Sequence, residues 1–306
     1  MRLPQQKHGR RYHNSSEEDR RRQVFSQRIQ HVLSVNSKNL SYKLELNSFS
    51  DLTEQEFNEQ KKGYIPDPRN YTRNRRSVFM ESQGNVTTPA SLDWVAMGRV
   101  TPPKDQGSCG DCWAFATTAV VEGLLAKKTG MLLNLSTQEI VDCSGSGACN
   151  GGEFTVPMRY LISNYGSQTL WADYTYAAVK QDCQASCFSR QIIGPNIGYT
   201  NVPSGDEAAL LQAVNRGPVF VGINANTSAF QSYKTGVINL STQDCDPRNI
   251  DHAVTLVGYG YDSTLQLNYW KVKNSWSTTW GEGGYGRIAR GTNVCGIASF
   301  AAEGTL

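Results

Sequence analysis

Two absences limit the chemistry of this 306-residue sequence. The first 108 residues contain no cysteine, and after His31 the chain contains a single histidine, His252. A zinc site built from cysteine and histidine needs four such ligands, usually in two close pairs. Because one histidine accompanies the eight cysteines, a mixed zinc site is disfavoured. We expect no metal and no cofactor.

Long apolar runs are also absent. No stretch approaches the roughly 18 apolar residues of a membrane span, and the start, MRLPQQKHGRRYHNSS, lacks the apolar stretch of a secretory signal. Eight cysteines nevertheless suit an oxidising compartment, so we expect a leader that was removed or missed and a lysosomal, endosomal or extracellular location. Seven Asn-x-Ser/Thr sequons support this: Asn14, Asn39, Asn70, Asn85, Asn134, Asn226 and Asn239.

Charge is divided unevenly along the chain. Residues 1–84 carry 16 Lys and Arg against 10 Asp and Glu, whereas residues 85–306 carry 14 against 17. The basic stretch RRYHNSSEEDRRR has no aromatic interleaving of the kind that nucleic-acid binding favours. We therefore expect no nucleic-acid partner, and a front segment that packs on an acidic body partly through charge.

Periodicity predicts an α+β protein in which a helical half precedes a strand-rich half. Residues 16–36 predict an amphipathic helix, with an apolar stripe at Val24, Ile29, Val32 and Leu33. Helical signals reach about residue 60, and residues 61–86 are polar and aperiodic, as expected of a linker. Residues 112–128 are apolar on nearly all sides, which predicts a buried helix. Alternation after residue 251 predicts a hairpin.

The stretch Cys109-Gly110-Asp111-Cys112 allows three interpretations. Half of a zinc site would need a second close pair, for which Cys183 and Cys187 are loose candidates. A redox pair would need a strand-to-helix junction in a βαβ unit, and no such alternation surrounds Cys109. The third interpretation is a reactive thiol beside a structural cysteine.

The reactive-thiol interpretation explains the most residues. Cys112 begins the predicted buried helix, where the dipole and unpaired N–H groups favour a thiolate. His252 is the only possible imidazole base in the body. Asn274, on the returning hairpin strand, can hold one imidazole nitrogen while the other faces sulfur.

Four blocks carry a resemblance to a known family: QGSCGDCWAF, CNGG at 149–152, DHAVTLVGYG and NSWSTTWGEGGYGRIARG. They resemble, in order and over nearly the whole chain, the papain family of cysteine proteases, nearest its cathepsin L-like branch. The resemblance implies a helical lobe at about 98–200, a β-barrel-like lobe at about 201–306, and a cleft between them. It implies Cys112 as nucleophile, His252 as base and acid, Asn274 as orienting residue, Gln106 as oxyanion donor, and Trp276 as a shield.

The front segment resembles the inhibitory propeptide of that branch. One interrupted motif appears as Glu18, Arg22, Phe25 and Asn36, with Val32 in place of the usual Ile and Arg28 in place of an Asn. A second appears as Asn47, Phe49 and Asp51, with Glu45 where Gly is usual. The resemblance implies a proenzyme with residues 1–86 as propeptide and 87–306 as peptidase domain. We expect falling pH to protonate carboxylates such as Asp51 and release the propeptide.

The resemblance also implies disulfides and binding residues. The implied pairs are Cys109–Cys149, Cys143–Cys183 and Cys245–Cys295, which leaves Cys187 without a partner. A subsite for the second residue before the cut is implied at Gly151, Gly152, Phe154, Gly222, Ile250 and Phe300. Because Phe300 stands where relatives often have a small or acidic residue, we expect a short pocket that prefers Val, Leu or Ile over Phe or Arg.

These features predict a monomeric endopeptidase that acts on proteins or peptides, is held by its own propeptide, and is open to cystatin-type inhibitors. The chain lacks the paired-histidine insertion of cathepsin B-like relatives, which would favour dipeptide removal. The alternatives are an inactive relative that serves as a binding protein, and a thiol oxidoreductase. Asp111 stands where relatives usually have Ser. We expect it to cap the helix, or to face the sulfur through a water-like dielectric and change its pKa by about half a unit.

Overall fold

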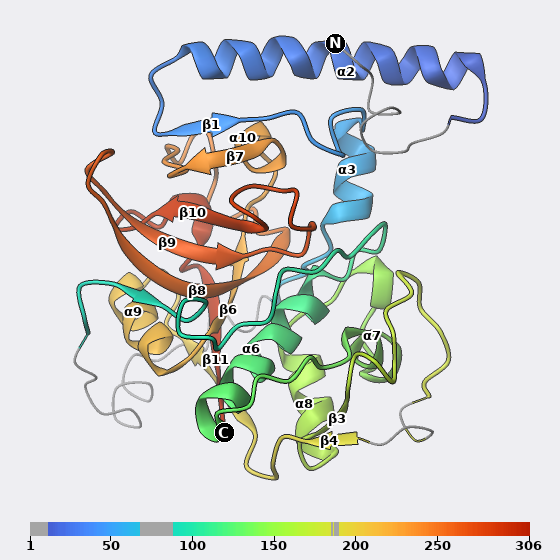
Figure 1. The fold of residues 1–306 in the computed structure, drawn as a ribbon, viewed down its shortest axis with the longest axis vertical. Coiled ribbons are helices and arrows are strands. Elements are labelled where there is room, and N and C mark those ends of the chain that lie inside the picture. Colours follow the sequence, from blue (N-terminus) through green and yellow to red (C-terminus); the bar gives the residue numbers. More distant parts are fainter. Residues whose placement is uncertain (1–11, 68–87, 185, 187–189) are drawn as a thin grey trace.

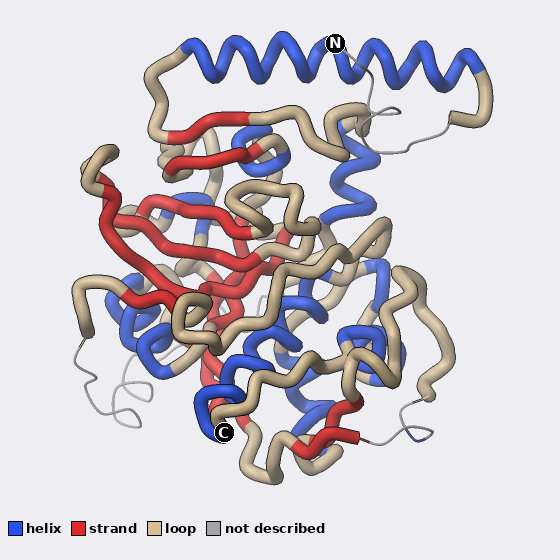
Figure 2. Tube along the Cα trace, in the orientation of Figure 1, coloured by secondary structure: helices blue, strands red, loops and turns tan. Residues whose placement is uncertain are grey.

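The computed structural model describes residues 12–67, 88–184, 186 and 190–306, with the backbone alone for 190–192. Helices gather in one lobe of the body and strands in the other, and the front segment, residues 12–67, lies across one end (Figures 1 and 2). Within the described residues, no helix is long and apolar enough to span a membrane. The α+β architecture is therefore as predicted.

The helical lobe is built around α6 (Cys112–Thr129), which is buried from Cys112 to Ala126. This matches the predicted buried helix. It ends at Gly130, whose left-handed backbone at φ 80° suits glycine. The surrounding elements are α7 (Thr137–Cys143), η1 (Ala148–Asn150), α8 (Thr155–Ser163), β3 (Ser167–Thr169) and β4 (Arg190–Ile192).

The strand lobe is one antiparallel sheet in the order β10-β9-β8-β6-β11-β5, with β2 also paired to β8. The predicted hairpin is present as β8 and β9. Every residue of β6 is buried, so this strand lies inside the lobe. The elements are β2 (Leu92–Asp93), β5 (Gly198–Val202), α9 (Glu207–Arg216), β6 (Val219–Ile223), α10 (Ser228–Gln231), β7 (Tyr233–Gly236), β8 (His252–Asp262), β9 (Leu267–Lys273), β10 (Tyr285–Ala289), η3 (Val294–Gly296) and β11 (Phe300–Thr305).

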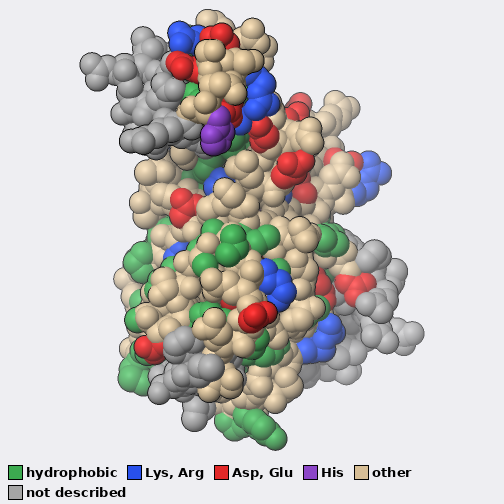
Figure 3. All heavy atoms as spheres, turned by 90° about the vertical axis from the view of Figure 1, so that its right-hand side faces the viewer, with side chains coloured by type: hydrophobic (Ala, Val, Ile, Leu, Met, Phe, Trp, Pro, Cys, Tyr) green, Lys and Arg blue, Asp and Glu red, His purple; other side chains and the backbone are tan. Residues whose placement is uncertain are grey.

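The front segment consists of α2 (Ser15–Ser37), β1 (Tyr42–Leu44) and α3 (Glu54–Lys61). It packs on the strand lobe because β1 pairs with β7 and its apolar side chains join that lobe's core. The buried face of α2 is Arg21, Phe25, Val32 and Val35, whereas Leu33 is exposed. The apolar stripe predicted from the sequence therefore differs from the buried face of α2 by part of a helical turn. Charged side chains of both signs cover the outer surface of this segment (Figure 3).

Not every carboxylate of the front segment becomes protonated in mild acid. Burial acts to raise the pKa of Glu56, but hydrogen bonds from Arg21 and Thr53 outweigh it and lower that pKa to about 2. A lowered pKa means that the pair stabilises the segment fully above the ordinary pKa of the carboxyl, and that this stabilisation is lost progressively as the pH falls from there to about 2. The Arg21–Glu56 pair, at 2.5 Å, therefore persists at pH 4 to 5. Asp51 is fully buried and accepts a hydrogen bond from Tyr12.

All three implied disulfides are present: Cys109–Cys149, Cys143–Cys183 and Cys245–Cys295. The first joins the residue three before Cys112 to the loop that carries Gly151 and Gly152. The structure thus separates the two cysteines of the C-G-D-C stretch into one bonded cysteine and one thiol. Cys187 lies outside the described residues.

Candidate active site

Cys112 and His252 come from different lobes and meet at their junction. Cys112 is the first residue of α6, and His252 is the first residue of β8. The backbone N–H of Ala253 lies 3.4 Å from Cys112 Sγ and points at it. Both Cys112 and His252 are fully buried. The predicted pair is therefore brought together by the packing of a helix against a strand.

Hydrogen bonds define the tautomer of His252. The Ser275 backbone N–H, which can only donate, lies 2.8 Å from Asn274 Oδ1, so this atom is the amide oxygen. His252 Nε2 lies 2.9 Å from the same oxygen and must therefore donate its proton to it. His252 Nδ1 is buried without a hydrogen-bond partner. The arrangement leaves Nδ1 as the nitrogen that can accept a proton.

Trp276 covers the imidazole. Its ring stacks on His252 with centroids 4.5 Å apart and planes 29° apart, and its side chain is fully buried. The indole Nε1 donates to Lys61 O at 3.0 Å, and Phe57 packs edge-on against the indole at 5.2 Å. Trp276 thus shields the imidazole, as predicted, and is also an anchor for the front segment.

Gln106 is held with one amide hydrogen to spare. Its Oε1 accepts from Ser275 Oγ at 2.6 Å, and its Nε2 donates to Cys109 O at 2.8 Å. A primary amide has two N–H groups, so one remains for a further acceptor. The Cys112 N–H stands at the first position of α6, where no intrahelical acceptor exists. The Gln106 side chain and the Cys112 main chain therefore each offer one N–H group to a further acceptor.

Asp111 occupies neither predicted position. It precedes α6, but its side chain makes no capping hydrogen bond. It is fully buried and lies 2.7 Å from the hydroxyl of Tyr176, so the water-like dielectric assumed for it is wrong. Burial raises the pKa of Asp111 to about 8, while Tyr176 and Lys61 lower it.

The front segment passes directly over Cys112, between the lobes. Gly63 and Tyr64 donate backbone hydrogen bonds to Asp251 O of the strand lobe. On the other side, Gly152 N donates to Gly63 O, and Ile65 N donates to Gly152 O. Lys61 ends α3, and residues 62–65, expected to belong to a linker, therefore lie between the lobes as an extended segment with one parallel bridge, Tyr64 to Gly152.

Close approach explains the glycines at this crossing. A Cβ on Gly151 would lie 2.7 Å from the Ile65 side chain and 2.8 Å from Gly63 O. A Cβ on Gly152 would lie 2.7 Å from the Trp113 ring. Both positions predicted from sequence thus border the crossing chain. Lys62 adds an ion pair with Asp251 at 2.7 Å, which supports the predicted charge attraction.

Tyr64 fills a pocket that the sequence analysis described incompletely. Its ring lies 5.3 Å from the rings of both Phe220 and Phe300. A Cβ on Gly222 would lie 2.6 Å from this ring and 2.7 Å from Ile250. An aromatic ring therefore fits beside Phe300, so this contact does not favour the expected preference for Val, Leu or Ile over Phe, which stays a prediction.

Phe154 lies behind this pocket. It packs on Phe220, with ring centroids 4.8 Å apart. Phe220 is the wall residue that sequence reasoning missed. The signal for it was present, because Phe220 and Gly222 are two residues apart on one strand and so share a face.

Burial keeps the thiol and imidazole uncharged. It raises the pKa of the Cys112 thiol far above its ordinary range, and nearby Asp111 and Asp251 raise it further. Burial lowers the pKa of His252 to about 3, partly opposed by the bond to Asn274 and aided by Lys62. While the front segment covers them, burial therefore favours the neutral thiol and the neutral imidazole over an ion pair.

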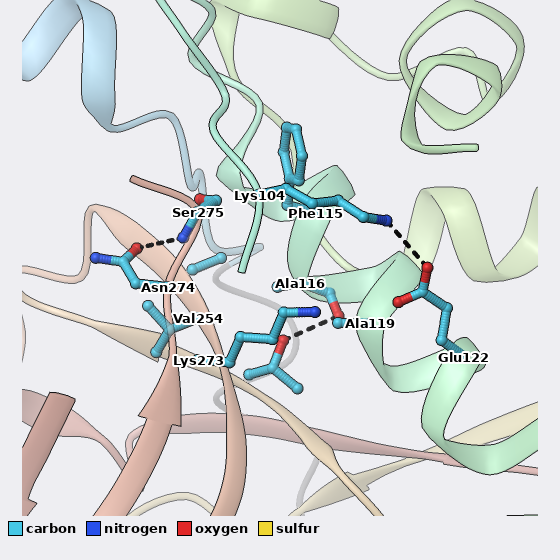
Figure 4. A pocket seen from close by; sticks show the side chains of 11 residues that line it. Lys104, Phe115, Ala116, Ala119, Glu122, Val254, Lys273, Asn274 and Ser275 are labelled. Carbon is cyan, nitrogen blue, oxygen red and sulfur yellow. Dashed lines mark hydrogen bonds and ion pairs between the residues drawn. The ribbon is translucent and has the colours of Figure 1, made fainter. Parts of the chain in front are cut away.

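A buried charge network supports the site from behind. Glu122, on α6, accepts from Lys104 Nζ at 3.0 Å and from Thr101 Oγ1 at 2.5 Å. Lys273 Nζ donates to Thr101 at 2.8 Å, and its pKa falls to about 8 because it is buried. Figure 4 shows Lys104 and Glu122 across a small cavity from Asn274. Sequence reasoning missed this network, although Glu122 is the one acid in the apolar helix.

Comparisons with known proteins agree with this site. Residues 88–305 match the family model described as papain family cysteine protease, and residues 5–57 match the cathepsin propeptide inhibitor domain. The chain is 39% identical to "Cathepsin L" of Sarcophaga peregrina, over 98% of this chain and 90% of that protein. It is 40% identical to "Digestive cysteine proteinase 2" of Homarus americanus, over 96% and 91%.

Solved structures of proenzymes have the same fold. A recombinant stem bromelain precursor matches with a TM-score of 0.86 at 36% identity, covering 99% of this chain and 96% of that one. Digestive procathepsin L 3 of Tenebrio molitor larval midgut matches with a TM-score of 0.84 at 33% identity, over 99% and 96%. The chain therefore belongs to the papain family of cysteine proteases, and it is a proenzyme whose front segment is the cathepsin-type inhibitory propeptide.

Proposed function

We propose that Cys112 is the nucleophile of an endopeptidase and that His252 is its base and acid. The observation that carries this is the His252 tautomer, in which Asn274 holds Nε2–H and leaves Nδ1 to take the thiol proton. The thiolate attacks the carbonyl carbon of the substrate, and the oxyanion accepts hydrogen bonds from the spare N–H of Gln106 and the N–H of Cys112. His252 then protonates the leaving amine, and water hydrolyses the acyl-enzyme.

Departure of the propeptide readmits water to this pair. The desolvation that keeps the thiol and imidazole neutral is then removed, and the ion pair can form. We expect a thiol-directed epoxide to label Cys112 after acid activation, with loss of peptidase activity, and to leave the intact proenzyme unlabelled. Mass mapping of the adduct checks this. Activated enzyme without label on Cys112, or with Cys109 labelled alongside it after mild reduction, would reject the proposal, the second result in favour of an oxidoreductase.

The pocket that holds Tyr64 is proposed as the subsite for the second residue before the cut. Phe220, Gly222, Ile250 and Phe300 line it, and none of these four carries a charge that could pair a basic side chain. Large apolar side chains, aromatic ones included, suit a site with this lining. Gly151 and Gly152 are proposed to bind the substrate backbone, as they border the propeptide backbone.

A peptide series varying only this residue tests the pocket. We expect kcat/KM with Phe to exceed that with Arg by at least about tenfold, because the pocket offers apolar contact and no charge. A Cβ at Gly222 would lie 2.6 Å from the ring now bound there. Gly222→Ala should therefore lower the rate for Phe more than for Val. Equal losses for Phe and Val would contradict this use of the pocket.

Lysosomal, endosomal or extracellular digestion of proteins is the proposed setting. Three disulfides suit an oxidising compartment, and the relatives' names include digestive proteinases. A monomer, with cystatin-type inhibitors as further partners, is proposed. Cleavage between the domains is proposed near residue 86. A binding role without catalysis is disfavoured by the intact Cys112, His252 and Asn274.

A further inference from the structure

Buried Asp111 and half-buried Tyr176 form a hydrogen-bonded pair beside the nucleophile. The Tyr176 hydroxyl lies 2.7 Å from Asp111 Oδ2 and 2.8 Å from the backbone oxygen of Gln106. Tyr176 also packs edge-on against Phe115, one turn into α6, with ring centroids 4.9 Å apart. The tyrosine therefore joins the start of the nucleophile helix to the main chain of the oxyanion residue.

Counting hydrogens in this group assigns the protonation state of Asp111. The hydroxyl has one hydrogen, and the Gln106 oxygen can only accept. If Asp111 were ionised, one of these two short contacts would join two oxygens with no hydrogen between them. If Asp111 is protonated, it donates to Tyr176, and Tyr176 donates to Gln106. Each contact then contains one hydrogen.

The surroundings of Asp111 favour the neutral form. The side chain is fully buried, and Oδ1 has no hydrogen-bond partner, which is costly for a carboxylate. Burial raises the pKa of Asp111 to about 8, lowered in part by Tyr176 and by Lys61 of the propeptide. The other ionisable groups that face the pair are Asp105, which acts on Tyr176, and Cys112. Lys61 leaves with the propeptide, so this opposing positive charge is absent from the mature enzyme.

We propose that Asp111 is a positioning residue that works as a neutral carboxylic acid, holding the Gln106 main chain beside Cys112 through Tyr176, and that its ionisation at alkaline pH lowers activity. Ionisation would break the hydrogen-bond chain and place a buried negative charge next to the sulfur, where it opposes the thiolate. The proposal rests on the proposed roles of Cys112 and Gln106.

Infrared spectroscopy tests the protonation state without requiring activity. In the Cys112→Ala proenzyme we expect a C=O band of a buried carboxylic acid that disappears as the pH rises past about 8. The band should be absent from Cys112→Ala/Asp111→Asn, and shifted in Cys112→Ala/Tyr176→Phe because its acceptor is lost. Other buried acids cancel in the difference between variants. Identical spectra with and without Asp111 would overturn the proposal, whatever the protease assay shows.

The pH profile of the activated enzyme tests the consequence. Asparagine stays neutral and can still donate to Tyr176, so Asp111→Asn should move the alkaline limb of kcat/KM upward by about one pH unit, since that limb no longer includes a carboxyl near 8. Asp173→Asn is the matched control, as Asp173 is an exposed acid three residues from Tyr176. An unmoved limb in Asp111→Asn, or an equal shift in the control, would refute the role.

Discussion

Replacing Cys112 with alanine should lower kcat/KM of the activated enzyme by at least about 10⁵-fold, the scale on which removal of a covalent nucleophile acts. Within the residues that the structure describes, no second thiol can substitute, since the other six cysteines there are paired in disulfides. The loss should appear in kcat, because Cys112 bonds to the substrate only during reaction. Steady-state hydrolysis of a Phe-containing peptide measures it.

The variant also separates chemistry from folding. Cys112→Ala removes one buried sulfur and keeps the three disulfides, so the proenzyme should fold and remain uncut at acid pH. Added wild-type enzyme should then remove its propeptide in trans. Residual activity above about one thousandth of wild type would show that another group is the nucleophile.

Gly63→Ala should weaken inhibition by the propeptide by about a thousandfold. A Cβ there would lie 2.0 Å from Gly110 O, and the Gly63 backbone, at φ 148°, belongs to a region that side chains rarely adopt. Backbone strain costs about 1–3 kcal/mol and overpacking a similar amount, and a total of about 4 kcal/mol corresponds to about a thousandfold in affinity. The inhibition constant of the isolated propeptide, added to activated enzyme, measures the change.

A matched substitution on the same segment provides the control. Gln55 is an exposed residue of α3, and its side chain donates a hydrogen bond to exposed Glu59. Gln55→Ala should leave the inhibition constant within about twofold. The Gly63→Ala proenzyme should also activate at a higher pH than wild type. Unchanged inhibition by Gly63→Ala would mean that residues 62–65 do not cross the active site in solution.

Much of the fold could be predicted from local patterns. The helix from Cys112 and the β8–β9 hairpin are both present. Thr53 and Glu56, and Ser136 and Glu139, have the Ser/Thr-x-x-Glu spacing of a capping box; the first box is complete and the second is half formed. Ser136 accepts from the Glu139 N–H, but the Glu139 carboxylate bonds to Tyr160 and Thr169 instead. Local motifs therefore predicted the backbone well, whereas tertiary contacts determined where the Glu139 side chain points.

For the active site too, some features could be predicted from the sequence and others could not. The identities of Cys112, His252 and Asn274 followed from residue type, position and scarcity, because few side chains can supply a nucleophile and a base. The wall at Phe220 and the bound ring of Tyr64 did not follow, since the pocket's size depends on the separation of strands and loops that are distant in sequence.

By itself, the sequence determined the chemistry and the order of the parts: a propeptide, a cysteine at a helix start, and a histidine and asparagine on a hairpin. Tertiary structure alone decided the tautomer of His252, the hydrogen-bond partner of Asp111 and the size of side chain that the pocket holds. The physical reason is the separation along the chain over which each interaction acts. Periodicity and capping act between residues a few positions apart, whereas burial and hydrogen-bond partners at the site depend on chains brought together from both lobes and the propeptide.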